Sequence, residues 1–358
     1  MNGIRNKRYS VRTDGDMEMA MRTSQKLYIG QVRNWLLLVM VLTLVVSSMC
    51  PLSRAHADDR NRPVRIGVLN ESWGPTPQDV GLRDGLTALG YQEDRDYFLG
   101  IRFTQGNRAA LPVAARELVD LGVDLIFTPT DHSAKAALLA TSQIPIVFAT
   151  ASDPIGEGLV QSFARPGGNI TGVADLAREL GPKRLQLFQE IIPGLQRVLF
   201  PYDASDAFAL KEAETYRRAA HQLGIELVEK PVQTPEEAQD VLSRLQPGEV
   251  DGVLQPRCCT LNIPGFVLDL MPAKRIPAMF DSAFWPERGA FASYGQDFYE
   301  TGRQAARLVD KILKGQQPGE IPVEVNSKLE FVINLKTAKT MGLTIAPEVL
   351  FQADRIIR

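Results

Sequence analysis

The chain has 358 residues, with 40 Lys and Arg against 42 Asp and Glu, and 44% of its side chains are hydrophobic. This composition is typical of a globular protein and excludes disordered, collagen-like and polytopic membrane chains. The formal net charge of -2 gives no basic field for nucleic acid, and the length predicts two domains that need no disulfide or metal to form a core.

The first 57 residues are typical of a targeting segment. Basic residues precede an apolar run at residues 35–46, and an Ala-His-Ala sequence ends at Ala57. This order predicts a secretory signal cleaved after Ala57, and hence a periplasmic protein. As a helix the run spans about 18 Å, against about 30 Å for the hydrocarbon core of a bilayer, which favours export over anchoring. An uncleaved membrane anchor and a lipid anchor at Cys50 remain as alternatives.

Two of the three cysteines, Cys258 and Cys259, follow this segment and are adjacent in the sequence. Adjacent cysteines bond to each other only through a strained ring, so we interpret them as two thiols. A redox role is the alternative.

The next part of the chain predicts strands that alternate with helices. An apolar run at residues 64–69 has strand length, and the helical pattern after it stops at Gly90. Further strands are predicted at residues 97–103, 124–127, 145–149 and 170–173, and the helices between them include one at residues 155–163. Because these runs are apolar throughout, both faces of the sheet should be covered, which indicates a doubly wound parallel α/β sheet.

A second series of the same kind begins near Leu180. Its strands are predicted at residues 197–200, 225–229, 251–254 and 276–280, and after this series two further strands are predicted at residues 291–294 and 329–333. Thr234, Pro235 and Glu237 predict a helix start in which Thr234 caps the first turn and Glu237 bonds back to complete a capping box.

The two series predict two lobes joined by short hinge crossings. We expect the N-terminal lobe to comprise residues 63–174 and 296–325, and the C-terminal lobe with its tail to comprise residues 178–282 and 329–358. The fold class is therefore α/β, with two doubly wound parallel-sheet lobes.

Candidate ligand contacts lie in the loops that follow the strands, because parallel α/β sheets bind ligands beyond the carboxyl ends of their strands. Aromatic rings beside acidic groups would suit a small amphipathic zwitterion. The alternative is that Trp73 packs at a rim and that Thr130, Asp131 and Asp153 only cap helices. The candidates are Ser72, Trp73, Thr130, Asp131, Ser133, Ser152, Asp153, Asp281, Ser282 and Phe284.

Catalytic motifs are weak. After the targeting segment the sequence has no H-E-x-x-H, G-x-S-x-G, P-loop or C-x-x-C, and no G-x-G-x-x-G after the first strand. We therefore expect neither catalysis nor a cofactor or metal. The alternative is an exported enzyme that uses Asp153 and Asp281 as an acid–base pair.

Six segments together resemble the family of ABC-transporter substrate-binding proteins related to the tryptophan-binding component TrpX, which has a periplasmic-binding-protein-like type I fold. The most specific stretch runs from Asp153-Pro154 to Arg165-Pro166-Gly167-Gly168-Asn169-Ile170-Thr171-Gly172. The matching segments are RIGVL from Arg65, GLRDGLTALGY from Gly81, LPVAARELVDLGVDLIF from Leu111, IPIVFATASDPIGEGLVQSFARPGGNITGV from Ile144, YGQDFYETGRQAARLVDKILKGQQP from Tyr294 and VINLKTAKTMGLTI from Val332.

The resemblance implies a monomeric, non-enzymatic receptor that closes on a small amphipathic solute, such as an amino acid, and delivers it to a membrane permease with its ATPase. It also implies ligand contacts in the loop after the first strand, at the start of the third helix, around Ser152 and Asp153, and around Asp281. An exported sensor that docks on a membrane signalling protein is the alternative. No nucleic-acid partner is expected.

Overall fold

The computed structural model describes residues 62–175, 177–257 and 261–358. The predicted signal at residues 1–57, Cys50 and the pair Cys258 and Cys259 lie outside the described residues. Among the described residues, no helix has both the length and the apolar character needed to cross a bilayer.

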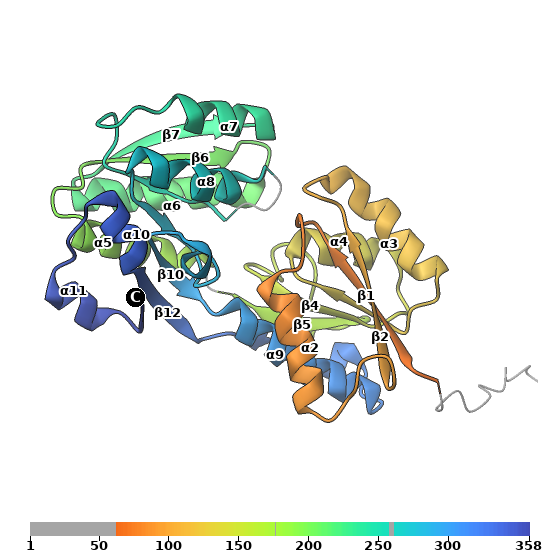
Figure 1. Ribbon diagram of the computed structural model, residues 1–358. Helices are drawn as coiled ribbons and strands as arrows, with labels where there is room; N and C mark the ends of the chain where they lie inside the picture. Colours follow the sequence, from red (N-terminus) through yellow and green to blue (C-terminus); the bar gives the residue numbers. More distant parts are fainter. Residues whose placement is uncertain (1–61, 176, 258–260) are drawn as a thin grey trace, which may run out of the picture. The chain divides into compact units, whose positions relative to one another are not determined.

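The first lobe is built on a sheet whose paired strands all run parallel, with the order β11-β5-β4-β3-β1-β2. Buried apolar clusters lie on both faces of this sheet, with α3 and α4 on one face and α2 and α9 on the other (Figure 1). The strands are β1 (Val64–Asn70), β2 (Tyr97–Phe103), β3 (Leu125–Thr128), β4 (Ile146–Ala151), β5 (Ile170–Ala174) and β11 (Glu324–Val325), and the helices are α2 (Pro77–Ala88), α3 (Leu111–Asp120), α4 (Asp131–Ala140) and α9 (Phe298–Leu313).

The second lobe has the sheet order β13-β12-β10-β9-β8-β6-β7. Its pairings are parallel except for β10 with β12, which is antiparallel. The strands are β6 (Arg197–Asp203), β7 (Glu226–Val232), β8 (Gly252–Leu254), β9 (Ala278–Phe280), β10 (Ala292–Gln296), β12 (Leu329–Asn334) and β13 (Arg355–Ile357), and the helices are α5 (Ala177–Ile191), α6 (Ala207–Leu223), α7 (Pro235–Arg244), α8 (Ile263–Lys274), α10 (Leu335–Met341) and α11 (Pro347–Gln352).

The expected fold class, α/β with two doubly wound parallel-sheet lobes, is confirmed, with the antiparallel pairing of β10 with β12 as a departure from it. One predicted element is wrong, because residues 155–163 form a series of turns and no helix. Gly158 has a φ of +71°, which a right-handed helix does not allow. Asp153 Oδ1 accepts the N–H of Gly156 at 2.9 Å and holds the first of these turns.

The start of α7 differs in one detail from its prediction. Thr234 caps the helix by accepting the N–H of Glu237 at 3.1 Å, as expected. The Glu237 carboxylate, however, accepts the N–H of Gln233 at 2.8 Å, one residue before the cap.

Two of the chain segments that connect the lobes lie side by side, near residues 297 and 326. The amide of Asn326 donates to Asp297 O at 2.8 Å and to Thr301 Oγ1 at 2.7 Å. Gln296 in turn donates to the carbonyl of Asn326. These hydrogen bonds fix the register of one connection against the other.

Helices α2 and α9 pack in direct contact. A Cβ added at Gly81 would lie 2.0 Å from the carbonyl oxygen of Tyr299, one at Gly85 would lie 2.6 Å from Ala306 Cβ, and one at Gly302 would lie 2.2 Å from Gln78 O. The N-terminus of α2 is thereby held against α9 at the carboxyl end of β1.

Candidate ligand-binding site

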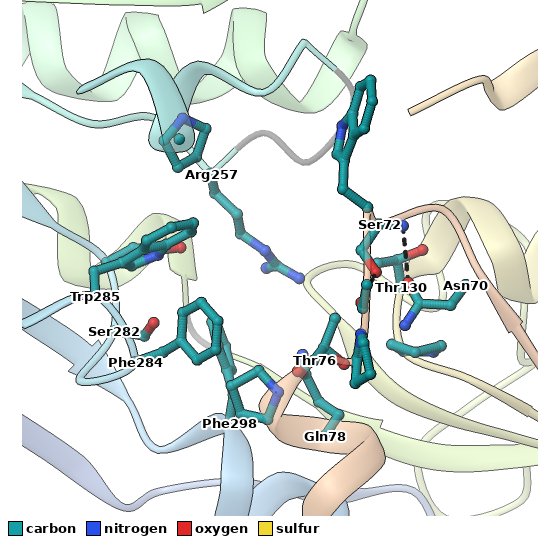
Figure 2. Close-up of a pocket in the computed structure, with 18 of the residues that line it drawn as sticks. Asn70, Ser72, Thr76, Gln78, Thr130, Arg257, Ser282, Phe284, Trp285 and Phe298 are labelled. Carbon is teal, nitrogen blue, oxygen red and sulfur yellow. Dashed lines mark hydrogen bonds between the residues drawn. The ribbon is translucent and has the colours of Figure 1, made fainter. Parts of the chain in front are cut away.

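A cavity of about 380 Å³ is lined by residues of both lobes. The first lobe contributes the loop after β1, the start of α2 and the loop after β3. The second contributes the loops after β8 and β9 and the start of α8, and Phe298 comes from the connection into α9. Figure 2 shows Arg257 extending into the space between Phe284 and the residues of the β1 loop.

Aromatic side chains form much of the cavity wall. Phe284 and Trp285 meet edge to face, with ring centroids 4.9 Å apart. The Arg288 guanidinium lies 3.4 Å from the centre of the Phe284 ring, and Phe298 also lines the space. Trp73, on the first lobe, remains 53% exposed at the cavity. Such rings provide apolar area and flat faces for an apolar or aromatic group.

Among the described residues, two buried acceptor atoms at the second-lobe side of the cavity have no hydrogen-bond partner. They are Gln255 Oε1 and Asp281 Oδ1, and their residues are 1% and 6% exposed. Burial raises the pKa of Asp281, although the charges of Arg184 and Arg257 lower it. A buried acceptor without a partner costs free energy, which a donor from a ligand would recover.

The buried Arg184 lies behind Asp281. Its Nε donates to Tyr294 O at 2.7 Å, its Nη1 donates to Tyr216 Oη at 2.5 Å, and Glu212 Oε1 lies 3.9 Å from Nη1. Burial raises the pKa of Glu212 to about 7, against the lowering effect of Arg184. The Arg184 guanidinium thus provides a buried positive charge that interacts with the Asp281 carboxyl group.

On the first-lobe side, Asp79 determines the shape of the β1 loop. Its Oδ2 accepts from Asn70 Nδ2 at 2.7 Å and from the N–H of Thr76 at 2.8 Å. Asn70 Oδ1 then accepts the N–H of Ser72 at 2.9 Å, and the Ser72 hydroxyl donates to Gly74 O at 2.5 Å. The polar groups of this loop are therefore used largely to hold the loop itself.

The predicted site residues divide into two groups. Six of the ten line the cavity, and these are Ser72, Trp73, Thr130, Asp281, Ser282 and Phe284. Thr130 also caps α4, because its Oγ1 accepts the N–H of Ser133 at 3.3 Å.

The other four predicted residues, Asp131, Ser133, Ser152 and Asp153, are not among those that line the cavity. Ser133 belongs to the α4 cap, and the Asp131 carboxylate accepts the N–H of His132. Ser152 contacts Arg257 and Asp175, and Asp153 holds the turn at Gly156.

The cavity residues that the sequence analysis did not name as ligand contacts include Gln255, Arg257, Arg288 and Phe298. Gln255 and Arg257 follow β8 directly. The rule that ligands bind beyond parallel strands could have found them, because residues 251–254 were already predicted as a strand. Phe298 carried no such signal, because it lies at the start of a helix in the connection between the lobes.

A second charged cluster joins the lobes without lining the cavity. Arg108 Nη2 lies 2.6 Å from Asp206 Oδ2, and Arg108 also approaches Asp203 and Glu71 at 3.6 and 3.7 Å. His132 Nδ1 lies 3.5 Å from Glu71 Oε1. Within the described part of the chain, no group of three or more His, Cys, Asp or Glu side chains is arranged to hold a metal ion.

The chain is similar to proteins that bind solutes. The family described as ABC transporter substrate binding protein matches residues 74–357. A tyrosine-binding protein of Clostridioides difficile is 27% identical over 286 residues, which cover 79% of this chain and 82% of that protein.

Two solved structures share its architecture. The crystal structure of a conserved domain protein from Vibrio cholerae is 30% identical, with a TM-score of 0.73, and the match covers 82% of this chain and 100% of that one. The structure of the ABC domain from Streptococcus pneumonia in complex with L-Trp is 26% identical, with a TM-score of 0.72, and the match covers 83% and 100%.

Proposed function

Because the chain belongs to the family of ABC transporter substrate-binding proteins and has the type I periplasmic-binding-protein fold, we propose that it binds an amino acid with a large aromatic side chain. The solute would occupy the cavity between the lobes. The protein would act outside the cytoplasm and deliver the solute to a membrane permease coupled to an ATPase.

The unpartnered acceptors Gln255 Oε1 and Asp281 Oδ1 are the observation that carries this proposal. Both line the cavity, and an ammonium group offers several N–H donors together with a positive charge for the carboxylate. Sugars and other neutral solutes bring donors but no such charge.

The aromatic wall supports the choice of side chain. Phe284, Trp285 and Phe298 line the same cavity as Asp281, so an ammonium group at Asp281 would leave the rest of an amino acid among these rings. The relatives named for tyrosine and solved with L-Trp agree with a solute of this class.

The test is a thermal-unfolding screen of the purified protein with L-tryptophan, L-tyrosine, L-phenylalanine, L-aspartate and myo-inositol. A ligand at 100 times its Kd adds about 2.7 kcal/mol to the free energy of unfolding, which raises Tm by about 5 °C in a chain of this size. We expect at least one aromatic amino acid to produce this shift, while L-aspartate and myo-inositol leave Tm unchanged.

Calorimetric titration of the amino acid that shifts Tm should then give a stoichiometry of one. A protein that unfolds cooperatively but responds to none of the three aromatic amino acids would refute the proposal. A shift with myo-inositol alone would refute it as well.

A further inference from the structure

Arg257 occupies a special position, because it lines the cavity from the second lobe and contacts the first lobe at the same time. Its Nη1 donates to Ser152 Oγ at 2.8 Å and forms an ion pair with Asp175. Ser152 and Asp175 lie at the ends of β4 and β5, whereas Arg257 follows β8. The guanidinium therefore lies at the boundary between the lobes and beside the solute cavity.

The contacts of this group form a closed triangle. Ser152 Oγ donates to Asp175 Oδ1 at 2.7 Å while it accepts from Arg257 Nη1. The Asp175 side chain is 1% exposed and that of Arg257 is 15% exposed, so the ion pair is shielded from water. An ion pair shielded in this way is strong only while both partners remain in place.

A zwitterionic solute needs a cation as well as the acceptors at Asp281. With its ammonium at Asp281, its carboxylate would carry the same charge as the Asp281 side chain and would need compensation. Arginine side chains are the only cationic groups among the described residues that line the cavity, and they are Arg257 and Arg288. Arg288 is stacked on the Phe284 ring and donates to Phe284 O at 3.2 Å, which directs it toward the aromatic wall.

We propose that Arg257 makes the cavity selective for solutes that carry a carboxylate, and that Asp175 and Ser152 hold its guanidinium until such a solute binds. This inference rests on the proposed function. The solute carboxylate competes with Asp175 for the same guanidinium, so the strength of the Asp175 contact limits the affinity for amino acids but not for the corresponding amines.

The experiment compares each amino acid with the amine that lacks its carboxylate, using L-tryptophan with tryptamine and L-tyrosine with tyramine. Calorimetric Kd values are measured for the wild-type protein and for Arg257→Gln. We expect the wild-type protein to bind the amino acid about 100-fold more tightly than the amine, because a charge-assisted pair with a guanidinium is lost in the amine. In Arg257→Gln the Kd of the amine divided by that of the amino acid should fall close to one, while the Kd of the amine itself changes less than about threefold.

Two further variants test the competition. Asp175→Asn removes the competing carboxylate, so the amino acid should bind about 10-fold more tightly and the amine should not. Ser152→Ala removes one hydrogen bond to Arg257, so it should also make the amino acid bind more tightly, but by a smaller factor than Asp175→Asn. Arg108→Gln is the matched control, because it breaks an ion pair between the lobes that lies outside the cavity, and it should change both Kd values by one common factor.

The inference is overturned if the wild-type protein binds the amine and the amino acid with equal Kd values. It is also overturned if Arg257→Gln raises both Kd values by the same factor, or if Asp175→Asn raises the Kd of the amino acid. Should Arg257→Gln fail to fold, Arg257→Lys replaces it, because it keeps the charge but loses the planar fork and should reduce the ratio. Failure of the proposed function is a different result, in which neither compound of a pair binds the folded wild-type protein.

Discussion

Asp281 shows how one residue can be both costly for folding and useful for binding. It follows β9, it is 6% exposed, and burial raises the pKa of its carboxyl group. A raised carboxyl pKa means that the ionised form costs folding free energy at a pH above the unfolded-state value of about 3.9. An ammonium group in the cavity would compensate that cost in the bound state only.

Asp281→Asn should therefore raise the Kd of an aromatic amino acid by about 100-fold without lowering the Tm of the unliganded protein. The wild-type affinity should also fall as the pH is lowered from neutral toward the raised pKa, since a protonated carboxyl group no longer attracts the ammonium. The asparagine variant should lack this pH dependence. Calorimetry from pH 5 to pH 8 measures both effects.

Asp269→Asn is the control for that variant, because it also replaces a carboxylate of the second lobe, but Asp269 is exposed on α8 and does not line the cavity. Its Kd should lie within about threefold of the wild-type value. An Asp281→Asn protein that binds as tightly as the wild type would show that the ammonium is held elsewhere.

At the scale of the single residue, the sequence indicated which loops face the cavity better than which side chains do. Asp281 and Trp73 could be named because they follow apolar strands. Ser133 and Ser152 also follow apolar strands, but hydrogen bonds turn the Ser133 hydroxyl toward Thr130 in the α4 cap and the Ser152 hydroxyl toward Asp175 and Arg257. The partners of Ser152 lie far away in the sequence, so the sequence alone could not show which way its side chain points.

Among the elements, the pair α2 and α9 determines where one wall of the cavity lies. Thr76, Pro77 and Gln78 line the cavity at the start of α2, and the glycines of this helix face α9. In an exposed helix interior, replacing glycine by alanine adds about 1 kcal/mol of stability. Here the backbone and side chains of α9 occupy the space that the new methyl group would need.

Gly85→Ala should consequently destabilise the protein by about 1 to 3 kcal/mol, which lowers Tm by about 2 to 6 °C. The control is Gly100→Ala in β2, where an added Cβ has no neighbour within 4 Å, and its effect should stay within about 0.5 kcal/mol. Thermal unfolding of both variants provides the comparison. A more stable Gly85→Ala protein would contradict the close packing of α2 on α9.

Elements with strong local signals were predicted well, and elements that depend on distant partners were not. β3 and β4 are buried along their whole length, so their apolar runs revealed them. β11 has two residues and β13 has three, and each is defined only by the strand with which it pairs. The failed helix at residues 155–163 had an apolar pattern, but Gly156 and Gly158 favoured turns.

For the whole molecule, the cluster around Arg108 and His132 links the lobes outside the cavity. Glu71 and Asp131 of the first lobe face His132, Asp206 of the second lobe lies 3.9 Å from its Nε2, and Arg108 is close by. Burial lowers the pKa of His132, but the hydrogen bond to Glu71 and the charges of Glu71 and Asp131 outweigh burial, so the net pKa is raised.

Because the pKa of His132 is raised in the folded protein, its protonation adds to the free energy of unfolding. This contribution is complete at a pH below the unfolded-state pKa of about 6.5, and it is lost as the pH rises through the higher folded-state pKa. Relative to His132→Gln, the wild-type Tm should be higher by about 1 to 2 °C at pH 6, a small effect because the side chain is one third exposed. The difference should vanish at pH 9.

Thermal unfolding of the two proteins from pH 5.5 to pH 9 tests this prediction. His221→Gln serves as the control, because His221 lies on α6 and is not part of this cluster. A difference between wild type and His132→Gln that grows with rising pH would contradict the assigned direction.

The first lobe has a further consequence for how the protein is made. Its helix α9 covers β4 and β5 and packs on α2, yet it lies at residues 298–313, after most of the second lobe in the sequence. During synthesis the ribosome releases β1 to β5 long before α9 exists, so the part of the sheet that α9 covers, over β4 and β5, stays exposed while about 120 further residues are translated. A premature stop before residue 298 would therefore leave neither lobe complete, because α9 and β11 of the first lobe and β12 and β13 of the second follow that position.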